Sequence, residues 1–136
     1  MEFMKSISVA ASGLQAQSGR MRIIAENIAN ADSTARAPGG DPYQRNVATF
    51  KAHFDRELKA SVVSLGRLEK DDAPFPTKYE PGHPAADERG YVKQPNVNTL
   101  IEVADMREAQ RSYEANLNVV TSTRAMMART LDILRG

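Results

Sequence analysis

The sequence contains no cysteine and no tryptophan, and its aromatic side chains are four Tyr and four Phe in 136 residues. Without cysteine the chain has no disulfide, no cysteine-zinc site and no thiol nucleophile. It also lacks an excess of either charge, with 18 Lys and Arg against 17 Asp and Glu. Residues 1–31 carry a formal charge of +1, and residues 32–97 and 98–136 each carry 0. Because phosphate binding requires a local basic excess, nucleic acid is not an expected partner.

Long apolar runs are missing as well. No stretch approaches the ~20 apolar residues that a membrane-spanning helix needs. Near the N-terminus only Lys5 precedes the short apolar run Ile7–Ala11, which Ser8 interrupts, and this is not the pattern of a secretory signal. We therefore expect no membrane span. If the protein leaves the cytoplasm, a route without a cleaved signal must carry it.

Sequence motifs for catalysis are also missing. The chain has no GxSxG elbow and no glycine-rich phosphate loop. Of its two histidines, His53 and His83, the second lies in a Pro-Gly-His-Pro stretch with Asp87 nearby. One histidine with loop carboxylates is a weak ligand set, so a solvated turn is the preferred interpretation. We expect no catalytic, cofactor-binding or metal site, and no enzymatic activity.

The distribution of proline divides the chain into three segments. All seven prolines lie between residues 38 and 95. This pattern predicts an N-terminal helix over residues 1–31, a small irregular β module over 32–97 and a C-terminal helix over 98–136. The predicted fold class is mainly α, with the two long helices paired as an antiparallel coiled-coil-like hairpin.

The N-terminal segment carries a seven-residue repeat. The repeat is formed by Ile7, Leu14, Met21 and Ile28, each followed three residues later by Ala10, Gln17, Ile24 or Ala31. Seven of these eight positions are apolar, which predicts an amphipathic helix. Gly13 and Gly19 lie inside it; they either permit close approach of a neighbouring helix or merely weaken the segment.

The C-terminal segment has the stronger helical pattern. Thr99 and Glu102 have the spacing of a capping box, with Asn98 as a competing N-cap. The positions that then alternate by three and four are Val103, Met106, Gln110, Tyr113, Leu117, Val120, Arg124, Met127, Leu131 and Leu134. Acids come early and arginines late, which suits the helix dipole.

Each helix has a second apolar stripe as well. The second stripes are Val9, Ala16 and Ile23 on the first helix and Val119, Met126 and Ile133 on the second. A two-helix hairpin buries only one face of each helix, so we expect the second stripes to pack against other copies or other proteins. Burying one apolar seam barely offsets the conformational entropy that is lost when a helix of this length becomes ordered. Both terminal segments of the chain are therefore expected to be largely disordered in the monomer and to fold on assembly.

The middle segment predicts a small twisted β-ribbon with irregular loops. Ala48–Phe54 alternates as a strand does, although Tyr43, Val47, Phe50 and Phe54 are also spaced as in a helix. Ser61–Leu68 reads as extended, and Tyr91–Val92 is a third short strand candidate.

These residues resemble the family of flagellar basal-body rod and hook proteins. The likeness lies in the N-terminal motif Ala11–Gln17, Arg20–Met21 and Ala25–Ala31, in the stretches Gly39–Arg45, Tyr79–Asp87, Gly90–Val92 and Pro95–Asn98, and in the C-terminal Arg111–Asn116 and Leu131–Leu134. The resemblance covers some 70 to 80 residues spread along the chain. Ser33–Arg36 departs from the Asn-Thr-x-Gly-Tyr ending that is common in other rod proteins.

The resemblance implies a structural subunit of the rod that crosses the periplasm within the basal body. Such subunits pass through the flagellar export apparatus without cleavage, and their terminal helices form a hollow shaft around the export channel. Implied partners are other copies of the chain, the rod proteins FlgB, FlgF and FlgG, and the rod-base protein FliE. A cytoplasmic helical-hairpin adaptor or regulator that uses the same heptads is the alternative function.

The expected assembly interface lies on the terminal helices. It comprises Ile7, Leu14, Met21, Asn27, Ile28, Asn30, Tyr113, Leu117, Val120, Met127, Leu131 and Leu134. Asn27 and Asn30 are expected to hydrogen-bond to the backbone of a neighbouring subunit, largely because of the resemblance; the alternative is a solvated helix end. Arg124 either sets the register by pairing with an acid across the interface or extends to the surface.

Overall fold

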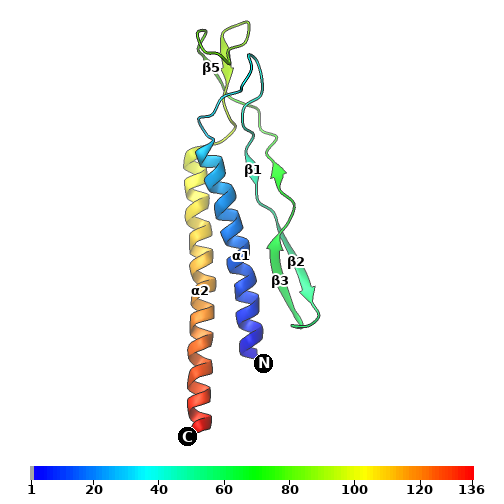
Figure 1. Cartoon of the computed structure of the whole chain (residues 1–136), viewed down its shortest axis with the longest axis vertical. Helices are drawn as coiled ribbons and strands as arrows, with labels where there is room; N and C mark the ends of the chain where they lie inside the picture. Colours follow the sequence, from blue (N-terminus) through cyan, green and yellow to red (C-terminus); the bar gives the residue numbers. More distant parts are fainter. Residues whose placement is uncertain (1) are drawn as a thin grey trace. The chain divides into compact units, whose positions relative to one another are not determined.

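The structure is a computed structural model that describes residues 2–136. Figure 1 shows two long helices and short paired strands. In chain order these are α1 (Glu2–Ala29), β1 (Asn46–Val47), β2 (Phe50–Asp55), β3 (Ala60–Leu65), β4 (Glu69–Lys70), β5 (Thr77–Tyr79), β6 (Tyr91–Lys93) and α2 (Thr99–Arg135). The predicted fold class, two long terminal helices with a small β module between them, is confirmed.

The strands form three separate two-stranded antiparallel pairs, β1 with β4, β2 with β3, and β5 with β6. The stretch around Phe50 and Phe54, whose spacing fitted both a helix and a strand, is a strand. In it, β2 pairs with β3 from Phe50 opposite Leu65 to Asp55 opposite Ala60. The third candidate strand is confirmed as β6, which pairs Tyr91 with Tyr79 of β5. Alternation and β-branched residues were thus the reliable signals here.

The chain divides into two compact units, each built from both helices and part of the middle segment. Unit 1 contains Met1–Met21, Thr49–Arg67 and Arg107–Gly136, and unit 2 contains Arg22–Ala48 and Leu68–Met106. The division into segments 1–31, 32–97 and 98–136 follows the sequence rather than these units and stays a prediction.

In unit 1, α1 and α2 run antiparallel and approach closely at a glycine. A Cβ on Gly13 would lie 2.7 Å from Nδ2 of Asn116, so this position has no room for a side chain as the helices are packed. Seven residues further along α1, Arg20 forms an exposed ion pair with Glu108 at 3.5 Å. Gly13 therefore serves close helix approach, the first of the two interpretations that its sequence left open.

The β2–β3 hairpin lies along α1 in the same unit. Ser12 Oγ accepts the backbone N–H of Val63 at 3.2 Å, so the edge of β3 that does not pair with β2 faces the helix. A Cβ on Gly19 would clash with a methyl carbon of Leu65. Gly19 thus permits approach of a strand, whereas the sequence suggested a helix.

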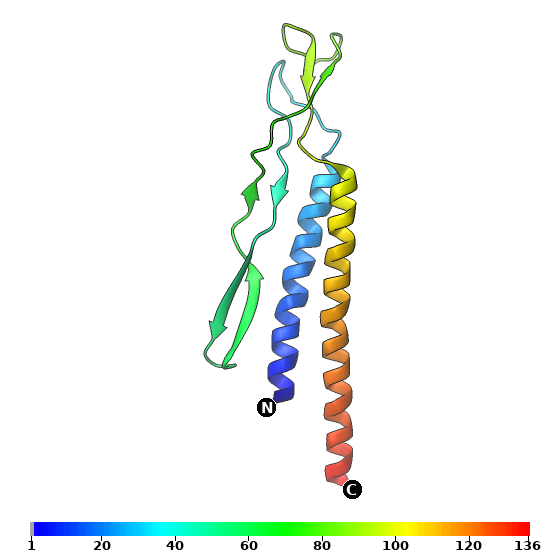
Figure 2. The ribbon, with the colours of Figure 1, turned by 180° about the vertical axis from the view of Figure 1, so that it is seen from behind.

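The C-terminal turns of α2 extend beyond the N-terminal end of α1 in unit 1 (Figures 1 and 2). Every residue from Ala128 to Gly136 is exposed. Leu131, Ile133 and Leu134 are among them, so an apolar end of α2 has no partner within the unit.

Unit 2 holds the best-buried apolar residues of the middle segment. Val92 of β6 is fully buried and Ala85 is 3% exposed. The rings of Tyr79 and Tyr91 pack edge to face with their centroids 5.2 Å apart. Gly90, at the turn before β6, has a φ of 85°, in the region that L side chains rarely adopt.

The start of α2 is capped differently from the capping box that the sequence offered. Asn98 Oδ1 accepts the N–H of Leu100 at 3.1 Å, so Asn98 is the N-cap. Glu102 does not reach back to the helix end, because its carboxylate is fully buried and bonded to residues from elsewhere in unit 2.

Candidate assembly interface

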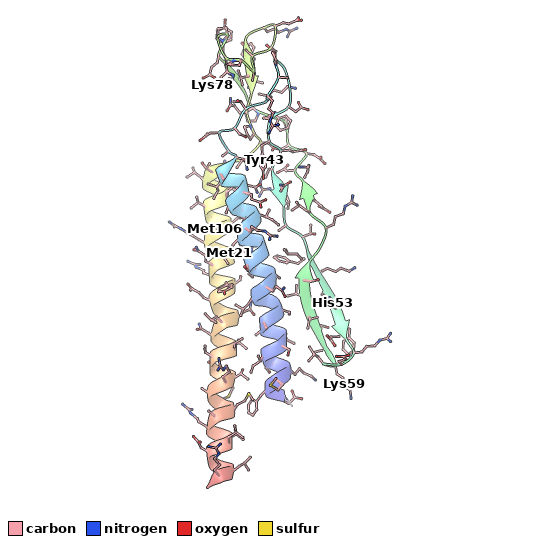
Figure 3. The ribbon with its side chains drawn as sticks, in the orientation of Figure 1. Met21, Tyr43, His53, Lys59, Lys78 and Met106 are labelled. Carbon is pink, nitrogen blue, oxygen red and sulfur yellow. The ribbon has the colours of Figure 1, made fainter. Side chains whose placement is uncertain are left out.

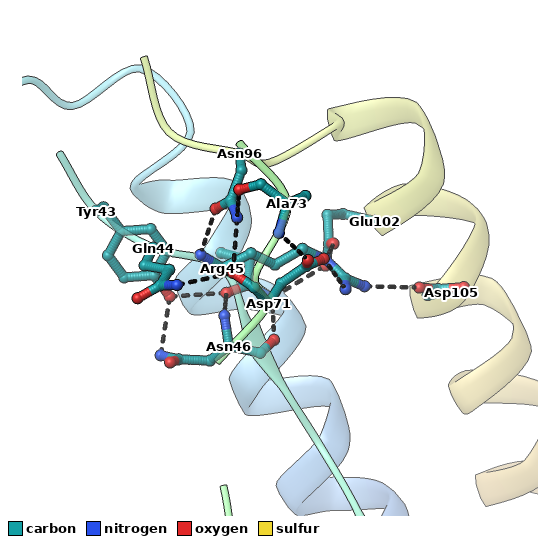
Figure 4. A network of polar contacts seen from close by, with 10 residues as sticks. Tyr43, Gln44, Arg45, Asn46, Asp71, Ala73, Asn96, Glu102 and Asp105 are labelled. Carbon is teal, nitrogen blue, oxygen red and sulfur yellow. Dashed lines mark hydrogen bonds and ion pairs between the residues drawn. The ribbon is translucent and has the colours of Figure 1, made fainter. Parts of the chain in front are cut away.

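A partly buried polar cluster joins the end of α1 to the start of α2 in unit 2 (Figure 4). We call it the Arg45 cluster. Its members are Asn27, Tyr43, Gln44, Arg45, Asn46, Asp71, Asn96, Glu102 and Asp105. Residues far apart in sequence meet here, since Arg45 and Glu102 are 57 positions apart.

Arg45 lies among three carboxylates. Its Nε donates to Glu102 Oε1, and its terminal nitrogens lie 3.2 Å from Asp71 and 3.5 Å from Asp105. Burial by itself would lower the pKa of the Arg45 guanidinium, but the hydrogen bonds and charges of Glu102 and Asp71 outweigh it and raise that pKa. The guanidinium thus stays charged and compensates Glu102, the largest fully buried side chain of the described chain.

Asn27 is the second hub of the cluster. Its Oδ1 accepts the Tyr43 hydroxyl at 2.7 Å and the N–H of Asn46 at 3.0 Å. Its Nδ2 donates to the Asn46 carbonyl at 2.8 Å and to Glu102 Oε2 at 3.2 Å. Burial raises the pKa of the Tyr43 hydroxyl, which keeps it a hydrogen-bond donor.

Asn27 was expected to bond to a neighbouring subunit, and the structure gives it another role. The amide does bond to backbone, but to backbone of its own chain, and the side chain is 1% exposed. No face of Asn27 is left for another molecule. Asn30 is half-buried and donates to the Glu26 carbonyl of its own helix at 2.8 Å. Asn27 therefore acts within its own chain, whereas the interface role expected for Asn30 stays a prediction.

Small or polar residues occupy every seventh position on the face of α2 that packs against α1. Glu102, Ala109, Asn116 and Thr123 follow this spacing, and all but the half-buried Asn116 are buried. Of the apolar seam expected from sequence, Met106, Tyr113, Val120 and Met127 are half-buried beside this row. Leu134, in the same row as Met127, is exposed. The other five members of that expected seam lie one position further round α2 and are exposed: Val103, Gln110, Leu117, Arg124 and Leu131.

Large apolar side chains are consequently exposed along α2. On the expected interface, Leu117 is 41%, Leu131 54% and Leu134 78% exposed, and in the second stripe Val119, Met126 and Ile133 are exposed as well. In Figure 3 side chains project from α2 along its whole length. Contiguous apolar surface of this kind is typical of a protein interaction site.

The second apolar stripe of α1 was expected to pack against other copies or other proteins, but the structure buries most of it within the chain. Ala16 is 3% and Ile23 8% exposed, and Val9 is half-buried. Ala16 lines a groove of about 230 Å³ with Val63 and Leu65 of β3, so the hairpin of the same unit covers this position. Sequence reasoning missed this because it assigned no partner for the hairpin. The expected α1 interface residues Ile7, Leu14, Met21 and Ile28 are all half-buried.

The two histidines lie apart, one on a strand and one in a turn. His53 is exposed on β2, and His83 Nδ1 accepts the N–H of Ala85 within a turn. Among residues 2–136, no three metal-ligating side chains converge on one point. Neither helix in that range is long and apolar enough to cross a membrane.

Two family models match the ends of the chain. The description "Flagella basal body rod protein" matches residues 7–37, and "Flagellar basal body rod FlgEFG protein C-terminal" matches residues 88–133. The first spans most of α1 and the loop that follows it. The second spans the turn before β6 and nearly all of α2, where the exposed apolar side chains lie.

Curated relatives match over nearly the whole chain. The chain is 52% identical to the flagellar basal-body rod protein FlgC of Agrobacterium fabrum, over 94% of this chain and 92% of the relative. It is 39% identical to FlgC of Borreliella burgdorferi over the full length of both, and 37% identical to FlgC of Escherichia coli O157:H7 over 98% of both. With these identities over these lengths, the chain belongs to the flagellar basal-body rod protein family and, within it, to the FlgC proteins.

Proposed function

We propose that the chain polymerises through the exposed apolar face of α2, together with the half-buried apolar row of α1, into the hollow shaft of the rod. It is a structural subunit of the flagellar basal-body rod, as its family is. The observation that carries the proposal is the exposure of Leu117, Leu131 and Leu134, because an ordinary monomer does not leave so many large apolar side chains on one helix in water.

The proposed interface consists of the apolar residues expected from the sequence. On α1 these are Ile7, Leu14, Met21 and Ile28, and on α2 they are Tyr113, Leu117, Val120, Met127, Leu131 and Leu134. Asn27 is omitted because its buried amide bonds within the chain, whereas the half-buried Asn30 remains a proposed member. Proposed partners are other copies, the rod proteins FlgB, FlgF and FlgG, and the rod-base protein FliE. Passage through the flagellar export apparatus without cleavage, into the part of the rod that crosses the periplasm, belongs to the same proposal.

The Arg45 cluster supports this role by fixing the helix pair. Buried charges fix register because any other pairing leaves one of them without a partner. The cluster pairs its three carboxylates with one guanidinium, and only that of Glu102 is fully enclosed. An enzymatic role has no support from this arrangement.

A strain that lacks the gene tests the proposal. We expect no rods or hooks in it, and restoration by the wild-type gene. Leu117→Arg should be expressed and exported but should not restore motility, because the arginine removes roughly 1.5–3 kcal/mol of apolar burial per contact. Asn118→Arg, at an exposed polar position of the same helix outside the row of Leu117, is the matched control and should restore swimming. Normal basal bodies in the deletion strain would refute the proposal and favour the adaptor alternative.

A further inference from the structure

The pair of strands β5 and β6 has one buried face and one exposed face. Val92 belongs to the first and is fully buried. Its neighbours Tyr91 and Lys93 lie on the opposite face, because successive side chains of a strand alternate. Across the ladder, Tyr79 lies opposite Tyr91 and Thr77 lies opposite Lys93. We call these four residues, Thr77, Tyr79, Tyr91 and Lys93, the tyrosine face; Tyr79 is 62% and Tyr91 44% exposed.

The two tyrosine rings are held in place by the turn between the strands. They pack edge to face at 61°, and a Cβ on Gly90 would lie 2.9 Å from Cε2 of Tyr79. The Asp87 carboxylate accepts the backbone N–H groups of Arg89 and Tyr91 at 2.9 and 3.0 Å, which fixes the turn. Rings that are ordered before a ligand arrives lose little conformational entropy when the ligand binds.

The tyrosine face differs in chemistry from the exposed surface of α2. That surface is aliphatic, with Leu117, Ile133 and Leu134 exposed, and suits a protein partner. The tyrosine face holds two aromatic rings, three hydroxyl groups and one ammonium group, and none of its four residues is Leu, Ile, Val or Met. The face of an aromatic ring is electron-rich and attracts the polarised C–H bonds of a sugar ring, while hydroxyl groups pair with sugar hydroxyls.

Two ion pairs flank the tyrosine face and leave it without a net charge. Lys93 Nζ lies 2.9 Å from Asp41 Oδ1, and Lys78 Nζ lies 3.0 Å from Glu80 Oε1. Exposed pairs of this kind are weak, so their polar atoms can also bond to a ligand. A nucleic acid would need unpaired cations. The balance of charge therefore favours a ligand that is polar but uncharged.

We propose that the tyrosine face binds a neutral glycan strand, whose sugar rings stack on Tyr79 and Tyr91. The hydroxyl of Thr77 and the ammonium group of Lys93 hydrogen-bond to the sugar hydroxyls. In the proposed rod, which crosses the periplasm, the glycan backbone of the cell wall is the available strand. The choice of this source rests on the proposed function, whereas the binding itself does not.

Titration of the ¹⁵N-labelled full chain with chitotetraose, a neutral hexosamine oligomer, tests the binding. Amide shifts should be confined to residues 77–79, 91–93 and their neighbours, and should saturate in the millimolar range. Tyr79→Thr with Tyr91→Thr removes both rings and should weaken binding roughly tenfold or more. Tyr79→Phe with Tyr91→Phe keeps the rings and should bind more tightly than the threonine variant.

The matched control removes two equally exposed rings from another strand. Phe50 is 44% and Phe54 63% exposed on β2, so Phe50→Thr with Phe54→Thr should bind chitotetraose as wild type does. Urea unfolding should show that every variant is folded under the titration conditions. Cellotetraose, a neutral glucose oligomer, separates the two sources of such a strand and should bind more weakly than chitotetraose.

Two results would overturn the glycan site. The first is a wild-type spectrum that neither oligomer changes at residues 77–79 and 91–93, which needs no variant to fold. The second is equal weakening by the control and the threonine variant, which would show non-specific adhesion to exposed rings. Equal or tighter binding of cellotetraose would overturn the cell wall as the source. None of these results bears on the rod itself, which the deletion strain tests separately.

Discussion

Removing the guanidinium of Arg45 should destabilise the chain more than any other single polar change in unit 2. Arg45→Met keeps the length of the side chain but leaves Glu102, which is fully buried, without its cation. Breaking a buried pair by removing one partner costs about 3–5 kcal/mol. The neighbouring Asn27 amide offers Glu102 one remaining donor at 3.2 Å, which does not replace a charge.

The complementary variant makes this reasoning testable. Glu102→Gln removes the buried charge while Arg45 keeps Asp71 and Asp105, so it should cost about 1–2 kcal/mol. In the double variant no fully buried charge is left without a partner, because Asp71 and Asp105, which also lose Arg45, are partly exposed to water. Arg45→Met with Glu102→Gln should therefore be more stable than Arg45→Met alone. Urea unfolding followed by far-UV circular dichroism measures all three. A loss below about 1 kcal/mol for Arg45→Met, or a double variant less stable than it, would refute the role assigned to the cluster.

Three further changes probe local geometry. Gly90→Ala should lower the free energy of unfolding in urea by about 1–3 kcal/mol, because the φ of Gly90 is 85° and a Cβ would lie 3.3 Å from the Cα of Pro81. Gly82→Ala, where a Cβ would meet open space, is the control and should be neutral. Asn98→Ala should cost about 1 kcal/mol by loss of the N-cap; an equal cost for Thr99→Ala would point instead to the capping box. Hydrogen bonds from the backbone of Tyr91 and Arg89 lower the pKa of the exposed Asp87 carboxyl, so the turn should keep its order above pH ~4 and lose it as the pH falls further. Amide chemical shifts at residues 89–91 should report this change, and an unchanged spectrum down to pH ~2 would contradict it.

Periodicity predicted the fold from sequence but placed the helix seam one position off. The heptads over Ile7–Ile28 and from Val103 onward predicted both helices, and the alternation around Phe50 predicted β2. Only part of the expected seam of α2 lies beside α1, because the packing of the two helices buries Ala109 and places Asn116 against Gly13. Apolar periodicity locates every apolar stripe on a helix, but it does not indicate which stripe packs against the helix's own chain.

The Arg45 cluster could not be predicted from the sequence. Arg45 lies in a loop with no periodic pattern, and its partner Glu102 is 57 residues away. At the start of a helix, Glu102 is more simply interpreted as a capping residue or as an acid that interacts with the helix dipole. Only the pairing of remote segments reveals that its carboxylate is enclosed. One hint was available, namely that Glu102 lies seven residues before Ala109 on the same face of the helix.

The ion pair between Arg45 and the buried Glu102 at the start of α2 also resists sliding of one helix along the other. If the two helices slipped past each other by one heptad, Glu102 would move about 10 Å away from Asn27 and lose its donors. A purely apolar seam would offer little resistance to such slippage, because one leucine replaces another at each step. In the proposed shaft, this pair would resist sliding of the two helices of each subunit, while the exposed apolar surfaces of α2 stay free to bind neighbours.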